Sequence, residues 1–322
     1  MSEILLLINQ LSEHPTEDEL DVLVQAEAVE QSLDELGYTH HREYFSLDLG
    51  SIIKTIENNP PDIVFNLVES VGGKGALIHF CPSLLEAFRI PFTGSGTYAM
   101  AVTTDKVRAK IILKEHDLPT PFWMLPYDAY KPSSNEQFII KPVWEDGSAG
   151  ITDESIVTGD FLRDKKIRKE LKVKGCFLET FIRGREFNLS VIGGEGGPLV
   201  MPAAEMQYLD YPAGKPKILN YASKWDSNSI EYQKTIRTFE IPEKDNSLIS
   251  KMVHIARECW DIFEIRGYMR VDFRVDEQNN PYVLEVNANP CLSPDAGFAA
   301  TCLTGGISYT KMIERILTDA RL

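Results

Sequence analysis

The stretch that decides the fold is YMRVDFRV at residues 268–275, followed after a short polar turn by YVLEVN at residues 282–287. Apolar and polar residues alternate along most of both runs. Successive side chains of a strand point to opposite faces of a sheet, so such alternation is typical of strands that are buried on one side. The sequence therefore predicts a β-hairpin with one apolar and one polar face.

The polar face of this hairpin is the most informative feature of the chain. A turn centred on residues 278 and 279 puts Asp272 opposite Glu285 and Arg270 opposite Asn287. Carboxylate and amide oxygens suit Mg²⁺, which proteins hold together with nucleotide phosphates. An arginine beside them can neutralise charge on a transferring phosphoryl group. The alternative is a surface hairpin with cross-strand charge pairs, which are common. We expect the opposite face to be apolar and to carry Val271, Phe273, Val275, Tyr282, Leu284 and Val286.

Charge and composition narrow the classes of partner. The chain has 322 residues, enough for two or three subdomains, with 33 Lys plus Arg against 48 Asp plus Glu and a net charge of −15. Such an acidic chain repels nucleic acid and anionic lipid. It contains no apolar run of membrane-spanning length and starts with no secretory pattern. We expect a cytoplasmic protein with reduced thiols and no zinc site, because the five cysteines show no CxxC spacing. They are Cys81, Cys176, Cys259, Cys291 and Cys302.

The pattern of elements changes along the chain. Strand and helix alternate over the first hundred residues, with a helix predicted from Glu17 to Leu36 that ends before Gly37. Alternation of this kind favours an open α/β layer. From about residue 138 strands dominate, and a helix is predicted from Asn246 to Phe263. Residues 210–240 have little periodicity, and a loop that long is usually functional or mobile.

A family resemblance rests on the hairpin and on motifs before and after it. RVDF at 270–273, with VLEVN at 283–287 and the Asn-Pro pair at 289–290, resembles the C-terminal signature of D-alanine–D-alanine ligases. Further matches occur in family order from about residue 62 to the end of the chain. They lie at residues 91–96, 104–106, 118–121, 140–142, 178–179, 184–187 and 305–309.

The resemblance implies an ATP-grasp fold, which combines α/β and α+β parts and clamps ATP between two lobes. It implies an N-terminal open α/β domain at residues 1–100, a central lobe at 101–182 and a C-terminal lobe with the metal site at 183–322. It also implies small-molecule carboxylate and amine substrates, ATP with Mg²⁺ or Mn²⁺, and a homodimer.

The resemblance also assigns the nucleotide site. Lys106 and Lys141 resemble the two lysines that contact phosphates, and Ser148 lies in what resembles the glycine loop over them. Glu179 to Ile182 resembles the hinge that reads adenine, and Glu186 resembles the carboxylate that holds the ribose. Read without the family, the lysines are solubilising, the loop is a turn, and both glutamates lie on solvated strand edges.

The implied reaction has two steps. ATP phosphorylates a substrate carboxylate to give an acyl phosphate and ADP, and an amine then displaces phosphate. Such chemistry needs positioning and charge neutralisation more than covalent help from the protein. Arg270 and Lys224 are accordingly the expected catalytic cations, and Asp272, Glu285 and Asn287 the expected metal ligands.

The substrate half of the site departs from the family. The family's substrate-binding histidine and glutamate are replaced by Val68 and Gly73, and Asp18 is only a loose counterpart of its first glutamate. The usual glycine after Pro290 is Cys291, whose thiol we expect to pack rather than react. The substrate-binding serine is Ala296.

A latch that closes the family's mobile loop is altered as well, because its serine–tyrosine pair falls on Gly147 and Trp225. We therefore predict a ligase for substrates other than a D-alanine pair. D-alanine–D-alanine ligation and a catalytically silent ATP-binding module are the alternatives. A NAD-binding Rossmann enzyme is disfavoured, because no glycine-rich turn follows the first strand.

Overall fold

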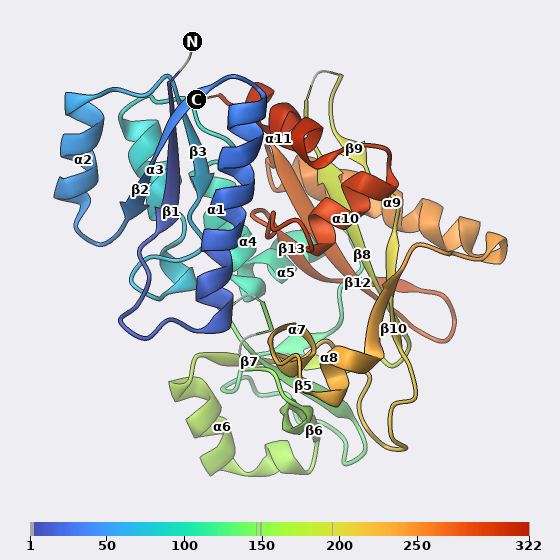
Figure 1. Cartoon of the computed structure of the whole chain (residues 1–322). Coiled ribbons are helices and arrows are strands. Elements are labelled where there is room, and N and C mark those ends of the chain that lie inside the picture. Colours follow the sequence, from blue (N-terminus) through green and yellow to red (C-terminus); the bar gives the residue numbers. More distant parts are fainter. Residues whose placement is uncertain (1–2, 146, 149, 195, 322) are drawn as a thin grey trace.

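The computed structural model describes residues 3–145, 147–148, 150–194 and 196–321. In this part of the chain the strands form three sheets, which lie in different parts of the molecule (Figure 1). The first sheet is parallel, with strand order β2-β1-β3. Its strands are β1 (Glu3–Asn9), β2 (Thr39–Phe45) and β3 (Ile63–Leu67), and its helices are α1 (Glu17–Glu35), α2 (Leu49–Asn58) and α3 (Phe80–Ala87).

The second sheet is small and antiparallel, with strand order β4-β7-β5-β6. It consists of β4 (Trp123–Met124), β5 (Gln137–Pro142), β6 (Ile156–Thr158) and β7 (Cys176–Thr180), with α6 (Lys165–Val173) packed against it. Two helices, α4 (Thr97–Thr104) and α5 (Lys106–Glu115), precede it in the chain. They are separated at Asp105, whose carboxylate caps α5 by accepting a hydrogen bond from the backbone N–H of Arg108.

The third sheet has six strands and carries the predicted hairpin. Its main order is β11-β10-β8-β12-β13, and β9 pairs with β8. The strands are β8 (Arg185–Ile192), β9 (Leu199–Val200), β10 (Ala204–Tyr208), β11 (Thr235–Thr238), β12 (Tyr268–Val275) and β13 (Pro281–Asn287). The helices of this half are α7 (Ala222–Trp225), α8 (Ile230–Lys234), α9 (Asn246–Ile262), α10 (Gly297–Thr304) and α11 (Tyr309–Thr318).

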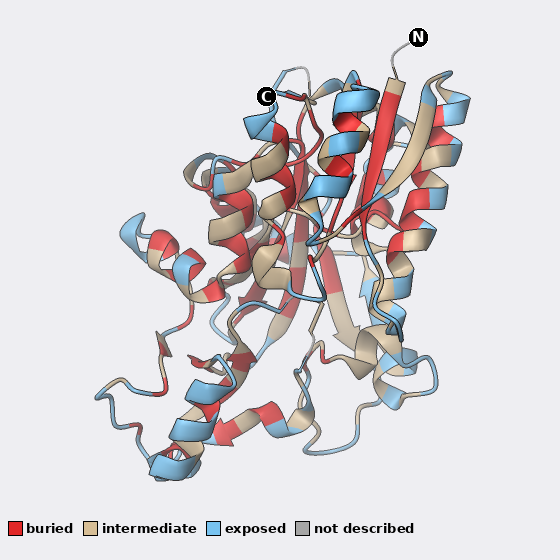
Figure 2. Cartoon of the chain, turned by 90° about the vertical axis from the view of Figure 1, so that its left-hand side faces the viewer, coloured by how far each residue is buried: buried red, intermediate tan, exposed pale blue. Residues whose placement is uncertain are grey.

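Burial follows these sheets, with buried strands inside and helices that expose one side to solvent (Figure 2). One core cluster joins the two ends of the chain, because β1 and α1 pack with α10 and α11. In Figure 1 the red C-terminal helices accordingly lie beside the blue helix α1. The first and third sheets are therefore held together by a shared apolar core. None of the helices described here is long and apolar enough to cross a membrane.

The hairpin has the predicted register near its open end, but its register near the turn differs from the prediction. Asp272 lies opposite Glu285, as the alternation predicts. Beyond this pair a β-bulge shifts the register, so that Phe273 lies opposite Val283. The prediction that Leu284 lies on the buried face is therefore wrong, since Val283 is fully buried and Leu284 is only half-buried. Tyr282 is half-buried for the same reason.

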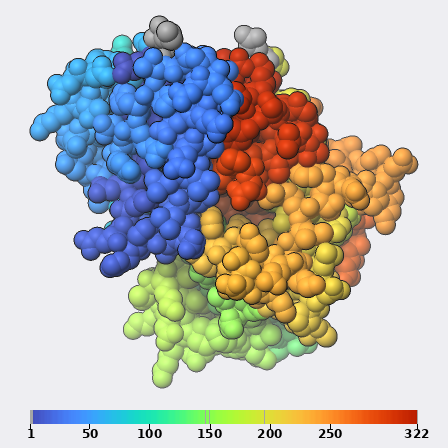
Figure 3. Space-filling model, in the orientation of Figure 1, coloured from blue at the N-terminus to red at the C-terminus, as the bar shows by residue number. Residues whose placement is uncertain are grey.

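The stretch at residues 210–240 also differs from the prediction. It contains the short helices α7 and α8 and the edge strand β11 rather than one long loop. Residues 209–234, here called the cover segment, lie over the third sheet and reach toward α1. In the space-filling view this orange part of the chain meets the blue N-terminal part (Figure 3). The cover segment thus brings together parts of the chain that are about two hundred residues apart, as the 203 positions between Asp18 and Tyr221 illustrate.

Candidate active site

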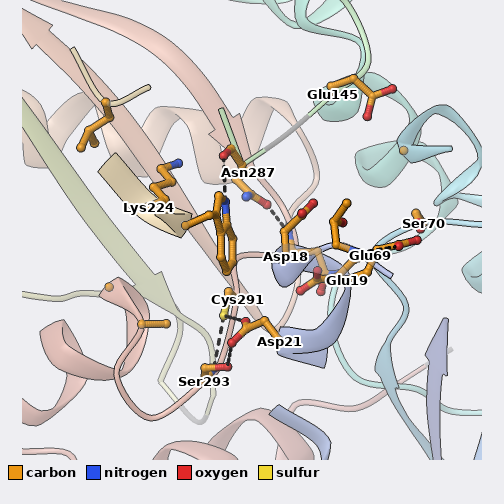
Figure 4. Close-up of a pocket in the computed structure, with 18 of the residues that line it drawn as sticks. Asp18, Glu19, Asp21, Glu69, Ser70, Glu145, Lys224, Asn287, Cys291 and Ser293 are labelled. Atoms are coloured by element: carbon orange, nitrogen blue, oxygen red, sulfur yellow. Dashed lines mark hydrogen bonds between the residues drawn. The ribbon is translucent and has the colours of Figure 1, made fainter. Parts of the chain in front are cut away.

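A cavity of about 810 Å³ lies between the start of α1, the loop after β3, the cover segment and the residues after β13. Of the residues that the sequence predicts for the site, Lys224, Arg270 and Asn287 line it. Its two sides differ in charge. Arg270, Lys224 and Arg237 supply cations from the third sheet and the cover segment, and the opposite side is acidic. The acidic side consists of Asp18, Glu19, Asp21 and Glu69, as Figure 4 shows.

The hairpin brings the predicted catalytic and metal residues together. Arg270 lies opposite Asn287, next to the pair formed by Asp272 and Glu285. The Arg270 guanidinium donates two hydrogen bonds to the Asp272 carboxylate, at 2.7 and 2.8 Å. The Asn188 side chain donates a third, at 2.7 Å. This bidentate contact fixes the plane of the guanidinium at the edge of the cavity.

The two cations predicted to be catalytic, Arg270 and Lys224, have different electrostatic surroundings. Burial alone would lower the pKa of Arg270, but the charge and hydrogen bonds of Asp272 raise the pKa above its ordinary value. Arg270 is therefore charged at any physiological pH. Burial lowers the pKa of Lys224, and the positive charge of Arg270 lowers it further. An anion placed between the two side chains would relieve this repulsion.

The oxygens on the hairpin fit the ligand chemistry of Mg²⁺. Asp272 and Glu285 face each other across the strands, and Asn287 adds an amide oxygen two residues further along. The Lys106 ammonium lies 3.7 Å from Glu285 and donates a 2.7 Å hydrogen bond to the carbonyl of Glu145. Two carboxylates and an amide leave coordination positions for phosphate oxygens, as Mg²⁺ sites usually do. No cluster of three or more His, Cys, Asp or Glu with metal-binding geometry occurs in the described residues, so an amide is needed to complete this set.

Lys141 lies beside a second lysine that the sequence analysis missed. Its ammonium is 2.7 Å from the carboxylate of Glu179, and Lys110 of α5 forms an ion pair with the same carboxylate. Lys110 also donates a hydrogen bond to Thr120, at 2.8 Å. Burial lowers the pKa of Lys110. Burial alone would raise the pKa of Glu179, but the two lysines hold it below its ordinary value. Glu179 therefore places two cations next to each other.

The expected adenine and ribose residues are joined by an arginine. Arg274 donates hydrogen bonds to the Ile182 carbonyl at 3.1 Å and to the Glu186 carboxylate at 2.5 Å. It also bonds the carbonyl of Lys217 in the cover segment. Tyr208 donates to the same oxygen of Glu186, at 2.5 Å. The two expected residues thus lie together, and Arg274 and Tyr208 are additions that alternation alone does not indicate.

The connection between the second and third sheets needs glycine. Gly184 joins β7 to β8 with φ of +141°, and a Cβ there would lie 2.0 Å from the carbonyl oxygen of Val275. Any other residue would clash with the backbone of the hairpin turn. The chain can therefore enter β8 beside the end of β12 only because residue 184 has no side chain.

Several hydrogen bonds hold the cover segment in place, and three of them involve residues at the cavity or at the loop beside it. Ser148 donates to the carbonyl of Leu219 at 2.8 Å, and Trp225 donates through its indole N–H to the carbonyl of Gly147 at 3.4 Å. The hydroxyl missing at residue 147 is thus replaced by a backbone contact. Tyr221 donates to Asp18 at the start of α1, at 3.0 Å. Gly147 and Trp225, the expected latch pair, are therefore in contact, but through a backbone carbonyl and an indole N–H.

Cys291 is held by an acidic residue that the sequence analysis did not single out. Its thiol donates to Asp21 at 2.9 Å, and Ser293 donates to the other oxygen of the same carboxylate at 2.9 Å (Figure 4). Burial raises the pKa of Cys291, and the charges of Glu69 and Asp21 raise it further. The thiol is therefore a protonated donor and a poor nucleophile, as the sequence analysis expected.

Comparisons with known proteins agree with this arrangement. The family model described as "D-ala D-ala ligase C-terminus" matches residues 137–318. A D-alanine–D-alanine ligase of Carboxydothermus hydrogenoformans is 30% identical over 284 residues, which are 83% of this chain and 84% of that protein. An uncharacterized protein of Sinorhizobium fredii is 27% identical over 92% of this chain and 87% of its own length.

Solved structures give the same result for the fold. The D-alanine–D-alanine ligase of Bacillus anthracis, solved in complex with ATP, superposes with a TM-score of 0.73 at 17% identity. The superposition covers 99% of this chain and 97% of the other. It confirms the predicted ATP-grasp fold with mixed α/β and α+β parts. From its matching family model and its relatives, the chain belongs to the D-alanine–D-alanine ligase family.

Proposed function

We propose that the chain is an ADP-forming ligase that joins a carboxylate to an amine through an acyl phosphate. The observation that carries the proposal is the cross-strand pair of Asp272 and Glu285 beside Arg270, at the edge of a cavity that Lys224 also lines. Carboxylates for a metal and cations for a phosphoryl group are what this reaction requires. A module that only binds nucleotide would not need a cavity with a cationic and an acidic side next to them.

Each part of the site then has a task. Lys141 and Lys110 supply charge for phosphates, while Ile182 and Glu186 lie where the nucleoside is expected. Asp272, Glu285 and Asn287 would hold Mg²⁺, which neutralises charge on the transferring phosphoryl group when it is bound. Ser148 fixes the loop over the phosphates to the cover segment. Lys106 is close to Glu285, and its assignment to the phosphates stays a prediction.

The chemistry follows from the charges of the cavity. An oxygen of the donor carboxylate attacks the γ-phosphorus, and ADP leaves. The amine nitrogen then attacks the acyl carbon, loses a proton, and inorganic phosphate leaves. Arg270 is fixed by Asp272 and stays charged, so it can stabilise negative charge in both steps. The cover segment excludes water, which would otherwise hydrolyse the acyl phosphate.

The substrates that we propose differ from those that the names of the relatives give. We propose that they are not a pair of D-alanines, because Val68, Gly73 and Ala296 lack the polar groups that the family resemblance leads us to expect there. D-alanine–D-alanine ligation is the second candidate, and the names of the relatives favour it. The three predicted domain segments, the homodimer and the cytoplasmic location stay predictions.

An acyl-phosphate trap tests the reaction class. The protein is incubated with ATP, Mg²⁺ and hydroxylamine over a panel of amino acids and hydroxy acids, and ADP and hydroxamate are measured together. At least one acid should give both in equal amounts, and Asp272→Asn should give neither. If the protein binds ATP but no acid gives hydroxamate or ADP, the silent-module alternative holds and the proposed function is wrong.

A further inference from the structure

Arg274 of β12 is a buried cation that the proposed chemistry does not use. It lies directly opposite Glu186 of β8, and only 3% of the residue is exposed. Its Nε donates a hydrogen bond to the carbonyl of Ile182 at 3.1 Å, and its Nη1 donates to the Glu186 carboxylate at 2.5 Å. Its Nη2 donates to the carbonyl of Lys217 in the cover segment. Each nitrogen of the guanidinium therefore has a different partner.

The carboxylate of Glu186 has its two oxygens in different surroundings. Oε2 accepts hydrogen bonds from both Arg274 and the hydroxyl of Tyr208, at 2.5 Å each. Burial raises the pKa of Tyr208, and the charge of Glu186 raises it further, so the hydroxyl stays protonated and donates. Oε1 accepts no hydrogen bond within the ranges that the structure describes. A carboxylate held in this way leaves Oε1 for a ligand that donates, and ribose hydroxyls are such donors.

Both residues that hold Glu186 are also linked to the cover segment. Arg274 reaches the segment through a backbone carbonyl. Tyr208 is the last residue of β10, directly before the segment, and its ring packs edge-on against Tyr211 with 5.2 Å between the ring centres. The same segment carries Lys224, which lines the cavity. The orientation of Glu186 and the closed position of the cover segment therefore depend on the same two side chains.

Opening of the cover segment would leave Arg274 with an unpaired donor inside the protein. A missing hydrogen bond costs most when the group is buried and charged. The guanidinium would then turn toward another acceptor, and Glu186 would lose its fixed partner. Glu186 is thus oriented best when the segment is closed. A ligand that binds Glu186 therefore favours the closed segment, because the coupling between two sites is equal in both directions.

We propose that Arg274 is a positioning residue that couples the ribose of the nucleotide, bound at Glu186, to the closed position of the cover segment and hence to Lys224. This inference rests on the proposed function. The ribose hydroxyls then serve turnover as well as affinity, since a nucleotide without them binds but does not hold Lys224 in place. A cross-strand ion pair that only stabilises the sheet would give no such dependence.

Two nucleotides and one conservative variant test the coupling. With a donor acid that gives hydroxamate, kcat and KM are measured for ATP and for 2′,3′-dideoxy-ATP, which lacks both hydroxyls. In the native protein kcat should be about tenfold higher with ATP, the size of a typical coupling between sites. Arg274→Lys keeps a positive charge beside Glu186 but loses the planar fork that reaches the cover segment. Its two kcat values should be equal and close to the native value with the dideoxy nucleotide.

Proteolysis follows the cover segment without any substrate acid. Trypsin can cut the segment after Lys217, Lys224 and Lys234, and mass spectrometry locates the cuts. At saturating nucleotide, ATP should protect these sites in the native protein about tenfold better than 2′,3′-dideoxy-ATP, because cleavage follows the population of the open form. In Arg274→Lys the two nucleotides should protect equally.

Arg183→Lys is the control. Arg183 is an exposed arginine close to Ile182 in the chain, and it donates to the side chain of Gln137 instead of to the cover segment. Its replacement should leave both ratios at their native values. Tyr208→Phe removes the other donor to Glu186 and should lower both ratios in part, which tests the link independently of how well Arg274→Lys folds.

Several results would overturn the inference and leave the ligase function standing. One is a native protein in which the dideoxy nucleotide changes only KM, with equal protection from trypsin. Another is a kcat ratio in Arg274→Lys that equals the native ratio, and a uniform loss of rate with both nucleotides would show that Arg274 has only a structural role. If no acid gives hydroxamate in the native protein, the proposed function is wrong, and the trypsin ratios decide the inference by themselves.

Discussion

Lys110 of α5 forms an ion pair with Glu179 of β7, and both side chains are only 1% exposed. Breaking a buried pair by removing one partner leaves a buried charge with less compensation. We therefore expect Lys110→Met to lower the free energy of unfolding by about 3 kcal/mol. Urea denaturation measures the change. Lys114→Met on the exposed side of the same helix should shift it by less than about 0.5 kcal/mol. Equal effects in the two variants would contradict the structural role of the pair.

Lys141 faces the same carboxylate and is expected to contact ATP. Lys141→Ala should weaken ATP binding about 10- to 100-fold, because it removes a charge-assisted contact with a phosphate from an acidic protein. Isothermal titration calorimetry with ATP and Mg²⁺ gives the affinity, and Lys131→Ala, at an exposed position, is the control. An unchanged ATP affinity in Lys141→Ala would contradict the assignment of Lys141 to ATP binding.

The metal site predicts a loss of turnover without a loss of fold. Asp272→Asn and Glu285→Gln should each abolish ADP formation, since Mg²⁺ then loses a carboxylate. The buried face of the hairpin is untouched, so circular dichroism and the melting cooperativity should be retained. Glu277→Gln, an exposed carboxylate in the turn of the same hairpin, should turn over normally. Normal ADP formation in either of the first two variants would remove that residue from the metal site.

The Cys291 thiol gives a prediction about pH. Its raised pKa means that the thiolate forms only at higher pH than for an ordinary cysteine, so iodoacetamide should modify it slowly at pH 8 and faster as the pH rises. Asp21→Asn removes a nearby negative charge and should lower the pKa, which speeds the reaction about tenfold. Peptide mass mapping follows the site, and Glu13→Gln is the control. A rate that does not change in Asp21→Asn would contradict this account.

D-alanine tests the substrate prediction. A site built to hydrogen-bond the groups of one substrate rejects analogues that do not match them, often by about 10⁴-fold in kcat/KM. We expect little ADP release with D-alanine alone. Glu69 lines the cavity close to the place where a glutamate is missing at Gly73, and it is the feature most able to restore binding. Efficient ADP release with D-alanine, together with dipeptide detected by mass spectrometry, would overturn the prediction.

Alternation along the chain was enough to predict the pairing of Asp272 with Glu285, because side-chain direction in a strand has a fixed period. The bulge after this pair was not predictable, since one extra residue at Leu284 leaves no mark in the composition. Lys110 was missed for a related reason. Only burial distinguishes it from the solvated lysines that helices commonly carry, and burial depends on the distant strand β7.

The cover segment was expected to be irregular because its helices are too short to show a period: α7 has four residues and α8 has five. Neither Asp21 nor Arg237 lies in a recognisable sequence motif. Each acquires its place in the cavity from an element that is far away in sequence, α10 for Arg237 and the residues after β13 for Asp21. Local sequence patterns contain no information about contacts between residues that are far apart in the chain.

The hydrogen bonds from Ser148, Trp225 and Tyr221 influence how often the cover segment opens. Together with the ion pair between Lys215 and Asp153 and the hydrogen bond from Arg274 to the Lys217 carbonyl, they keep open molecules a small minority. Substrates enter and products leave through that minority. We therefore expect turnover to follow the rate at which these bonds break rather than the rate of acyl transfer. Solvent viscosity should then slow the enzyme even when every substrate is saturating.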